Sequence, residues 1–349
     1  MKAYVLDAIS DLKIKDIETP KCLPGEVLVE VKAAGICGSD IPRIYKTGSY
    51  HFPLIPGHEF SGEVVKAYDD DSEWKNKRVG IFPLIPCMKC AQCHSKKYEM
   101  CRDYSYLGSR TDGGFAEYVR VPTWNLINLP DTVSYEQAAM LEPMSVAVHA
   151  ARNAGLISYN KNNSGININK KIAIMGLGTI GLSLVMMLLS EGYTNIFAIG
   201  NKEIQKKIVK SLGLKDDCYI DSGDYTAGED LVDVFFDCVG TETVMDIALN
   251  SVVPGGKVIC VGNPASDMNI PKKTYWNILR KQLNLIGTWN SSFTHDINDD
   301  WHYVIDKLKN GEINPEKMIT HSYDFDGLIN GFEIMREKKE EYVKVMMVR

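Results

Sequence analysis

The 349-residue sequence lacks an excess of positive charge, a high proline content and any internal repeat or low-complexity tract. Lysine and arginine number 39 against 45 aspartate and glutamate, giving a formal net charge of −6. This balance argues against binding a nucleic-acid backbone as the main task. Only 14 prolines and 28 glycines, with 45% hydrophobic residues, exclude collagen-like and disordered proteins. A chain of this length usually folds as two domains.

The sequence also lacks the patterns of exported and membrane proteins. Residues 1–7 reach Asp7 before any apolar run of signal-peptide length. The apolar run at 172–189 imitates a membrane span, but three glycines divide it into a strand-like and a helix-like piece. Nine cysteines, an odd number, suit a reducing compartment in which thiols often bind metals. We therefore expect a cytoplasmic protein without membrane contact.

The secondary-structure pattern changes along the chain. Residues 1–125 contain short β-rich runs, and the alternation at 27–32 predicts a half-exposed strand. A helical pattern kinked at Pro143 covers 135–154. Strands then alternate with helices, before a C-terminal amphipathic helix and a final strand at 342–349. This order predicts an α/β protein with a mostly-β domain and a doubly wound parallel-sheet domain.

Four cysteines are closely spaced in the segment CMKCAQCHSKKYEMC, namely Cys87, Cys90, Cys93 and Cys101. Four thiolates at this spacing can surround one ion tetrahedrally, and a zinc ion without an open position is structural. The alternatives are free or paired cysteines in a loop, and a nucleic-acid-binding zinc ribbon, which the acidic net charge disfavours. The spacing predicts a structural zinc site.

A second set of potential ligands comprises Cys37 in AAGICGSD, and His58 and Glu59 in PLIPGHEFSG. Thiolate, imidazole and carboxylate are ligand types that hold a catalytic zinc at three points and leave a fourth for a substrate oxygen. Taken singly, a buried cysteine, a loop histidine or a solvated glutamate is the commoner interpretation. Glu142, in an apolar helical stretch, is either a surface charge or a further metal contact.

Gly176, Gly178 and Gly181 follow the strand-like KIAIM and open a helix-like segment. This is the context of a dinucleotide-binding turn. The glycines let the turn tighten and bring a pyrophosphate against backbone N–H groups at the helix N-terminus. Thr179 and Ile180, within the turn, are therefore also predicted cofactor contacts.

The next predicted strand, NIFAI, ends in Gly200, Asn201 and Lys202. An acidic residue that binds the ribose 2′-hydroxyl of NAD is absent there. A small residue, an amide and a cation make room for a 2′-phosphate, so the sequence favours NADP over NAD.

The motifs CGSD, GHEFSG, the four-cysteine segment, GLGTIG and Glu142-Pro143, in this order, resemble those of the zinc-dependent medium-chain dehydrogenases over essentially the whole chain. CGSDIPRIYKTG, GSRTDGGFAEY and LRKQLNLIGTW are most similar to the polyol and polyol-phosphate branch. The resemblance implies a GroES-like zinc-binding catalytic domain at 1–146 and 291–349, and a Rossmann NAD(P)-binding domain at 147–290, with the active site in the cleft.

The same resemblance implies two zinc ions per chain, the catalytic one held by Cys37, His58 and either Glu59 or Glu142. Because adjacent residues on an extended segment point to opposite sides, His58 and Glu59 need not bind the ion in one state. Ser39 either carries the released proton toward solvent or has a structural role at a turn, and Asp40 either orients a zinc ligand or caps the turn.

The expected activity is reversible hydride transfer between a secondary alcohol of a polyol or polyol phosphate, such as galactitol 1-phosphate, and NAD(P). One alternative is a general secondary-alcohol, butanediol or threonine dehydrogenase on the same scaffold. A different class is a catalytically silent NADPH-binding zinc module, although such a module has no need of an open zinc site.

Further contacts are expected from basic residues and from later loops. Arg43, Lys46 and Arg110 are candidate phosphate contacts, although solvated surface placement is the commoner interpretation for any one of them. Ligands of a doubly wound sheet lie outside the carboxyl ends of its strands. The loops there contain Cys238, Val239, Gly240, Val261, Gly262, Asn263, Thr288 and Trp289, of which Trp289 is equally a candidate core residue. Relatives are usually dimers or tetramers, so a homodimer or homotetramer is expected.

Overall fold

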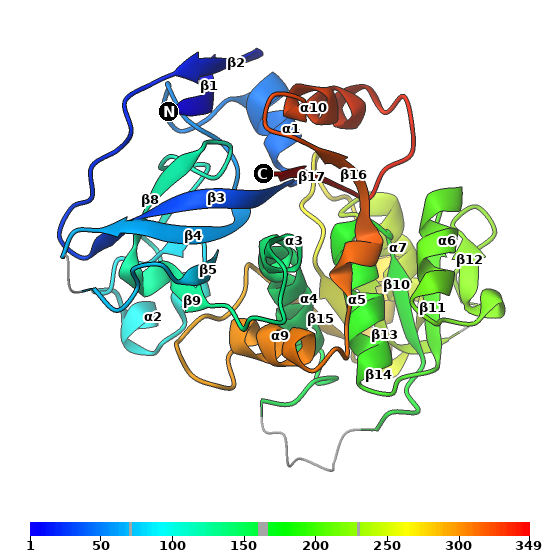
Figure 1. Cartoon of the computed structure of the whole chain (residues 1–349). Coiled ribbons are helices and arrows are strands. Elements are labelled where there is room, and N and C mark those ends of the chain that lie inside the picture. The colour runs from blue at the N-terminus through cyan, green and yellow to red at the C-terminus, as the bar shows by residue number, and fades with distance from the viewer. Residues whose placement is uncertain (70–71, 160–166, 229–230) are drawn as a thin grey trace. The chain divides into compact units, whose positions relative to one another are not determined.

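The computed structural model describes residues 1–69, 72–159, 167–228 and 231–349. They form two compact units. The first comprises Met1–Glu142, Ser292–Asp296 and Trp301–Arg349, and the second comprises Pro143–Ser291 and Ile297–Asp300. The first unit is therefore built from both ends of the chain, coloured blue through cyan to green and orange to red in Figure 1.

The first unit is built on a seven-stranded sheet in the order β16-β17-β3-β4-β5-β9, with β8 also paired to β3. Its strands are β3 (Glu26–Ile36), β4 (Glu59–Ala67), β5 (Arg78–Ile81), β8 (Tyr118–Pro122), β9 (Leu126–Asn128), β16 (Ile319–Tyr323) and β17 (Lys344–Val348). β3 pairs antiparallel with β4, β8 and β17. Figure 1 shows the C-terminal β17 beside β3. The last strand therefore joins the same sheet as the N-terminal strands β3 and β4.

Apolar alternation explains why β3 lies at the centre of this sheet. Val27, Val29 and Val31 are fully buried, whereas Glu30 and Lys32 are half-buried. The buried face packs on a core that includes Phe115 and Phe332, whose ring centroids are 5.2 Å apart. Each large apolar side chain buried in this way stabilises the fold by roughly 1.5–3 kcal/mol.

Short elements complete the first unit. Two small antiparallel sheets are formed by β1 (Lys2–Ala8) with β2 (Asp11–Asp16), and by β6 (Leu84–Ile85) with β7 (Ser105–Tyr106). The helical segments are α1 (Asp40–Pro42), η1 (Arg43–Thr47), α2 (Ala91–His94), η2 (Tyr98–Met100), η3 (Thr123–Asn125), α3 (Tyr135–Ala139), α9 (Asp300–Lys309), η5 (Pro315–Met318) and α10 (Leu328–Glu337). α9 begins at the last residue of the second unit.

The helical pattern at 135–154 forms two helices rather than one kinked at Pro143. α3 ends at Ala139, and α4 (Leu141–Asn153) starts two residues later. Pro143 therefore lies in the first turn of α4, where its missing N–H has no partner to lose. The boundary between the two units falls between Glu142 and Pro143, inside this helix.

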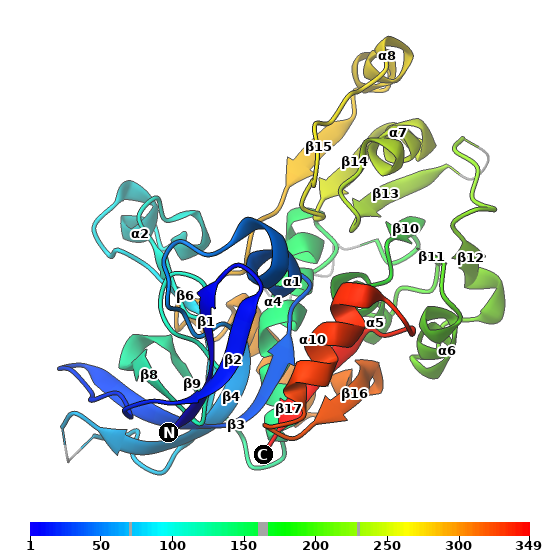
Figure 2. The ribbon, with the colours of Figure 1, turned by 90° about the horizontal axis from the view of Figure 1, so that it is seen from above.

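The second unit contains a parallel sheet in the order β12-β11-β10-β13-β14-β15 (Figure 2). Its strands are β10 (Ile172–Met175), β11 (Ile196–Gly200), β12 (Tyr219–Asp221), β13 (Val232–Asp237), β14 (Val252–Cys260) and β15 (Asn284–Gly287). Its further helical segments are α5 (Thr179–Ser190), α6 (Glu203–Ser211), η4 (Asp216–Cys218), α7 (Glu242–Ser251) and α8 (Lys272–Arg280). The predicted α/β class with a doubly wound parallel sheet is confirmed, and chain order reverses between β10 and β13.

The apolar run at 172–189 divides as the sequence predicts. Its first part is β10 and its second is α5, which has only 12 residues. In the part of the chain that the structure describes, no helix has the length and apolar character needed to cross a membrane.

Candidate active site and cofactor site

Strand pairing brings Cys37, His58 and Glu59 together in the first unit. Cys37 follows the last residue of β3, Glu59 begins β4, and the two strands pair with Gly35 opposite Glu59. One potential ligand atom from each of the three residues lies within 4.8 Å of the others. His58 precedes β4 and follows Gly57, whose φ of +96° turns the backbone. His58 is therefore not on a regular extended segment, and its ring converges with the Glu59 carboxylate.

Asp40 organises this group from a fully buried position. Its Oδ2 accepts a hydrogen bond from the backbone N–H of Cys37 at 3.0 Å, and its Oδ1 accepts one from Arg43 at 2.6 Å. Burial opposes its charge, but His58, Arg43 and the Cys37 amide keep the pKa of Asp40 below its usual value. Ser39 Oγ donates to Cys37 Sγ at 3.3 Å. Arg43 is thus engaged with Asp40.

His58 offers a buried ring nitrogen to this group. Its Nδ1 is buried without a hydrogen bond among the described residues and lies 3.5 Å from Asp40 Oδ1. Burial alone lowers the pKa of His58, but the Asp40 carboxylate and the Cys37 thiolate raise it well above the usual value. The surroundings therefore favour a positive charge at the ring. Sulfur, nitrogen and carboxylate oxygen at this spacing fit a zinc ion.

Two buried glutamates lie at the site in different environments. Glu59 forms an ion pair with Lys344, which is 1% exposed and also donates to the carbonyl oxygen of Ile36 at 3.2 Å. Glu142 accepts a hydrogen bond from the Tyr106 hydroxyl at 3.1 Å. Burial raises the pKa of Glu142 to about 7. Within the described residues, the group of atoms spaced for a metal contains Glu59 and not Glu142.

The four cysteines of the sequence motif also converge. One Sγ from each of Cys87, Cys90, Cys93 and Cys101 lies within 4.8 Å of the others. The Cys90–Cys93 and Cys90–Cys101 sulfur distances are 3.5 and 3.9 Å. Tetrahedral zinc with Zn–S bonds of about 2.3 Å requires sulfurs about 3.8 Å apart. Backbone hydrogen bonds lower the pKa of Cys90 to about 6, which favours the thiolate. The site fits zinc with no open position.

In the second unit, the three glycines from the end of β10 to the first turn of α5 have different surroundings. Gly176 has a φ of +97°, and a Cβ there would lie 2.6 Å from Val239 Cγ2. A Cβ on Gly181 would lie 2.1 Å from the carbonyl oxygen of Gly176. A Cβ on Gly178 would meet nothing within 4 Å. Gly176 and Gly181 are thus required by the fold, whereas Gly178 leaves open space at the start of α5, where Thr179 and Ile180 form its first turn. This arrangement fits a pyrophosphate.

Other predicted cofactor residues follow the carboxyl ends of neighbouring strands. Gly200 ends β11, and a Cβ on it would lie 2.6 Å from Gln205 Oε1. Gln205 Oε1 accepts a hydrogen bond from the Asn201 N–H at 3.0 Å. Asn201 is exposed and Lys202 is half-buried. Gln205 therefore fills the space that an acidic residue at position 200 would need.

Asp237, at the end of β13, holds the loops that contain Val239, Gly240 and Gly262. Its Oδ1 accepts from the N–H groups of Val239 and Gly240 at 2.9 and 2.8 Å. Its backbone oxygen accepts from the N–H groups of Val261 and Gly262 at 2.9 and 2.8 Å.

The remaining residues of these loops include Cys238, Asn263, Thr288 and Trp289. Thr288 Oγ1 accepts from Asn153 at 3.5 Å. Trp289 is 54% exposed, which excludes the core interpretation.

The sequence analysis missed several of these contacts. Lys344 and Tyr106 have no local signal, because each reaches its partner across a long stretch of chain. Asp237 did have a local signal in the sequence, because it is an acidic residue at the end of an apolar strand, immediately before a glycine-containing loop.

Comparisons with known proteins agree with this architecture. The family model for the alcohol dehydrogenase GroES-like domain matches residues 23–131, and that for zinc-binding dehydrogenase matches residues 179–310. L-idonate 5-dehydrogenase from Vitis vinifera is 32% identical over 344 residues, covering 93% of this chain and 88% of that protein. The chain belongs to the zinc-dependent medium-chain dehydrogenases.

As a medium-chain dehydrogenase, the protein is an oxidoreductase of the alcohol and polyol dehydrogenase type. Galactitol 1-phosphate 5-dehydrogenase from Escherichia coli K12 is 29% identical over 337 residues, covering 93% of this chain and 94% of that protein. The crystal structure of galactitol-1-phosphate dehydrogenase from Escherichia coli has a TM-score of 0.89 at 27% identity, covering both chains completely. An Escherichia coli CFT073 alcohol dehydrogenase in complex with NADH has a TM-score of 0.87 at 25% identity, covering 100% of this chain and 99% of that one.

Proposed function

We propose that this dehydrogenase catalyses the reversible oxidation of a secondary alcohol on a polyol or polyol phosphate, with NAD(P) as the hydride acceptor. The convergence of Cys37, His58 and Glu59 carries the proposal, because three ligands of these types leave a fourth zinc position for a substrate oxygen. Support for the substrate class comes from relatives named for galactitol 1-phosphate and L-idonate.

The chain's own residues have distinct roles in this reaction. Cys37 and His58 would hold the zinc ion, with Glu59 as third ligand and Glu142 able to replace it. When bound, zinc supplies Lewis-acid polarisation of the substrate hydroxyl and the nicotinamide accepts hydride. Ser39, hydrogen-bonded to Cys37 Sγ and half-buried, would pass the hydroxyl proton toward water.

We also propose a second, structural zinc ion at Cys87, Cys90, Cys93 and Cys101, and a preference for NADP. The NADP preference rests on the residues after β11: the small Gly200, the exposed amide of Asn201 and the cation of Lys202. A 2′-phosphate is a dianion that such groups can bind.

The proposed assembly is a homodimer or homotetramer, in the cytoplasm. β15 ends one side of the parallel sheet, and α8 carries Tyr275, Trp276 and Leu279 with exposures of 54, 47 and 54% (Figure 2). An exposed strand edge beside apolar side chains suits pairing with a second copy. None of the nine cysteines, all of which the structure describes, forms a disulfide, which suits a reducing compartment.

The proposal is tested by measuring NAD⁺ and NADP⁺ reduction with a panel of polyols and polyol phosphates. Cys37→Ser is expected to reduce kcat/KM by more than about 100-fold, since even residues that only orient ligands cost 10–100-fold when replaced. Cys22→Ser, at a cysteine that belongs to neither group of potential metal ligands, is the matched control and should behave as the unaltered protein. Near-normal turnover by Cys37→Ser, or no turnover of any alcohol by the unaltered protein, would refute the proposal.

A further inference from the structure

Arg110 is held in one orientation by two tyrosines of the first unit. Its guanidinium carbon lies 4.5 Å from the ring centroid of Tyr50 and 4.1 Å from that of Tyr104. The guanidinium also donates to the Tyr104 carbonyl oxygen at 2.7 Å and to the Tyr50 hydroxyl at 3.3 Å. His51 Nε2 lies 3.1 Å from the Arg110 carbonyl oxygen, which fixes the backbone as well. The side chain is therefore ordered before any ligand binds.

In the part of the chain that the structure describes, this arginine forms no ion pair. Among the described residues, no carboxylate lies within 4.0 Å of its guanidinium, although the side chain is half-buried. By contrast, Arg43 is paired with Asp40, and Arg120 with Glu26. An arginine carries five N–H donors, and two contacts use only part of them. A half-buried, unpaired cation with donors to spare is suited to an external anion.

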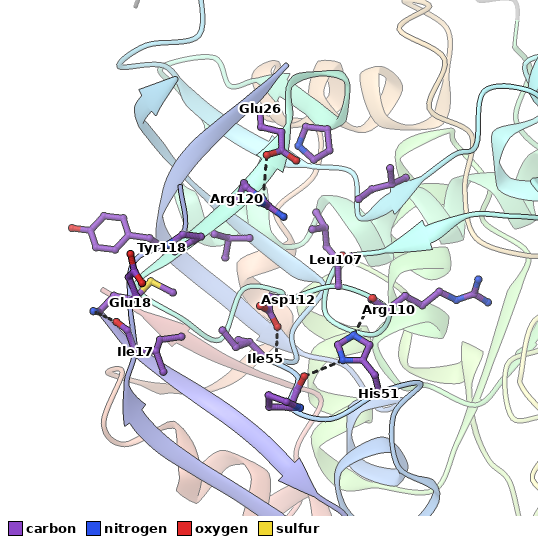
Figure 3. A pocket seen from close by; sticks show the side chains of 17 residues that line it. Ile17, Glu18, Glu26, His51, Ile55, Leu107, Arg110, Asp112, Tyr118 and Arg120 are labelled. Atoms are coloured by element: carbon purple, nitrogen blue, oxygen red, sulfur yellow. Dashed lines mark hydrogen bonds and ion pairs between the residues drawn. The ribbon is translucent and has the colours of Figure 1, made fainter. Parts of the chain in front are cut away.

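Aromatic contacts link Arg110 to the metal-binding group. Tyr104 packs on Tyr106 with ring centroids 6.2 Å apart, and Tyr106 packs on His58 at 5.7 Å. Figure 3 shows the Arg110 side chain extending away from His51, Asp112 and Ile55, which together with Arg110 line a pocket of about 410 Å³. Arg110 is thus separated from His58 by two tyrosine rings. These contacts place Arg110 in the same part of the first unit as the metal-binding group.

We propose that Arg110 binds an oxyanion at the end of the substrate remote from the reacting hydroxyl, and that the enzyme thereby selects polyols with a phosphate or carboxylate terminus. The inference rests on the proposed dehydrogenase function. The planar N–H edge of a guanidinium can donate two parallel hydrogen bonds to either group, whereas a neutral hydroxyl cannot use the charge. Arg43 and Lys46 are weaker candidates, because Arg43 is paired with Asp40 and Lys46 is exposed.

The test compares three six-carbon substrates: galactitol, galactitol 1-phosphate and L-idonate. The unaltered holoenzyme should prefer at least one anionic substrate over galactitol by at least about tenfold in kcat/KM. Arg110→Ala should remove that preference, with a loss of about 100-fold for the anionic substrate and less than about threefold for galactitol. Arg110→Lys should retain part of it, since charge remains but the planar donor pair is lost. Arg120→Ala, which removes an exposed arginine paired with Glu26, is the matched control.

Calorimetric titration of the zinc-loaded protein with the three compounds provides a readout independent of turnover. The inference is supported if Arg110→Ala weakens binding of the anionic compound and Arg120→Ala does not. This result counts even if no turnover is detected. Selectivity for galactitol 1-phosphate over L-idonate identifies the oxyanion as phosphate, and the reverse identifies carboxylate. Equal losses for neutral and anionic substrates in Arg110→Ala, or no binding of either anion, overturns the inference. Turnover of galactitol alone leaves the dehydrogenase function intact while rejecting the role of Arg110.

Discussion

Replacing Gly181 with alanine should lower the stability of the protein, whereas replacing Gly178 with alanine should weaken cofactor binding and leave stability nearly unchanged. A Cβ on Gly181 would lie 2.1 Å from the Gly176 carbonyl oxygen, whereas carbon–oxygen contacts are ordinarily about 3.3–3.6 Å. Because the atom that the Cβ would meet belongs to the backbone of Gly176, the backbone between Gly176 and Gly181 must shift to admit the methyl group. Overpacking of this kind costs about 3 kcal/mol at its upper end, and the better helix propensity of alanine recovers up to about 1 kcal/mol.

The net destabilisation expected for Gly181→Ala is therefore about 2 kcal/mol. For a cooperative unit of about 150–250 residues, this lowers Tm by about 4–8 °C. Gly178 has a φ of −75° and open space around its Cβ position. Gly178→Ala should change stability by less than about 1 kcal/mol, because alanine tolerates this backbone and only the helix cap is weakened slightly.

Nucleotide affinity should respond in a different way. The methyl group of Gly178→Ala would occupy the space through which a pyrophosphate approaches the N-terminus of α5. We expect the Kd for NADPH and NADH to rise at least about tenfold, equivalent to about 1.4 kcal/mol. Thermal unfolding without nucleotide and calorimetric titration with each nucleotide measure the two effects. The reasoning is wrong if Gly178→Ala binds both nucleotides as tightly as the unaltered protein, or if Gly181→Ala unfolds at an unchanged temperature.

Three further predictions concern the metal sites and the cofactor. Cys93→Ser should lower Tm and reduce the zinc content from two ions to one per chain, whereas unchanged metal content with normal unfolding contradicts a structural site at this cysteine. Gly200→Asp should lower the NADP-to-NAD ratio of kcat/KM at least about tenfold once Gln205 moves aside, and an unaltered ratio counts against NADP preference. Lys344→Met should cost about 3–5 kcal/mol in denaturant unfolding of the zinc-free protein because it leaves buried Glu59 unpaired, and the double variant with Glu59→Gln should regain most of that loss. A double variant as unstable as the single one would show that the pairing is not responsible.

Sequence patterns predicted the secondary-structure elements whose formation depends mainly on neighbouring residues in the chain. The alternation at Val27–Val31 predicted the central strand, and the glycines at 176–181 correctly divided the apolar run into β10 and α5. The helix break was placed wrongly, at Pro143, because proline interrupts helices in general but is tolerated in a first turn.

Long-range contacts at the site could not be predicted in the same way. Lys344 pairs with Glu59 across 285 positions of the chain. Nothing in the local pattern of the final strand distinguishes this lysine from a solvated one. The hydrogen bond between Tyr106 and Glu142 and the filling of the space beside Gly200 by Gln205 likewise depend on how separate segments pack. Residue types and spacing indicated which groups can bind zinc, but the groups that hold them in place follow only from the tertiary structure.

The position of β17 also constrains how the protein is made. A ribosome releases the segments that contain Cys37 and His58 long before residues 344–348 emerge, and β17 forms the neighbour of β3 on one side. Until then the edge of β3 at Ala33–Ile36 lacks its partner, and Glu59 lacks its lysine. The parallel sheet at 172–287, whose strands are all complete by then, can order earlier during synthesis. The surroundings of Glu59 are therefore complete only once residues 344–348 have been synthesised and β17 has paired with β3.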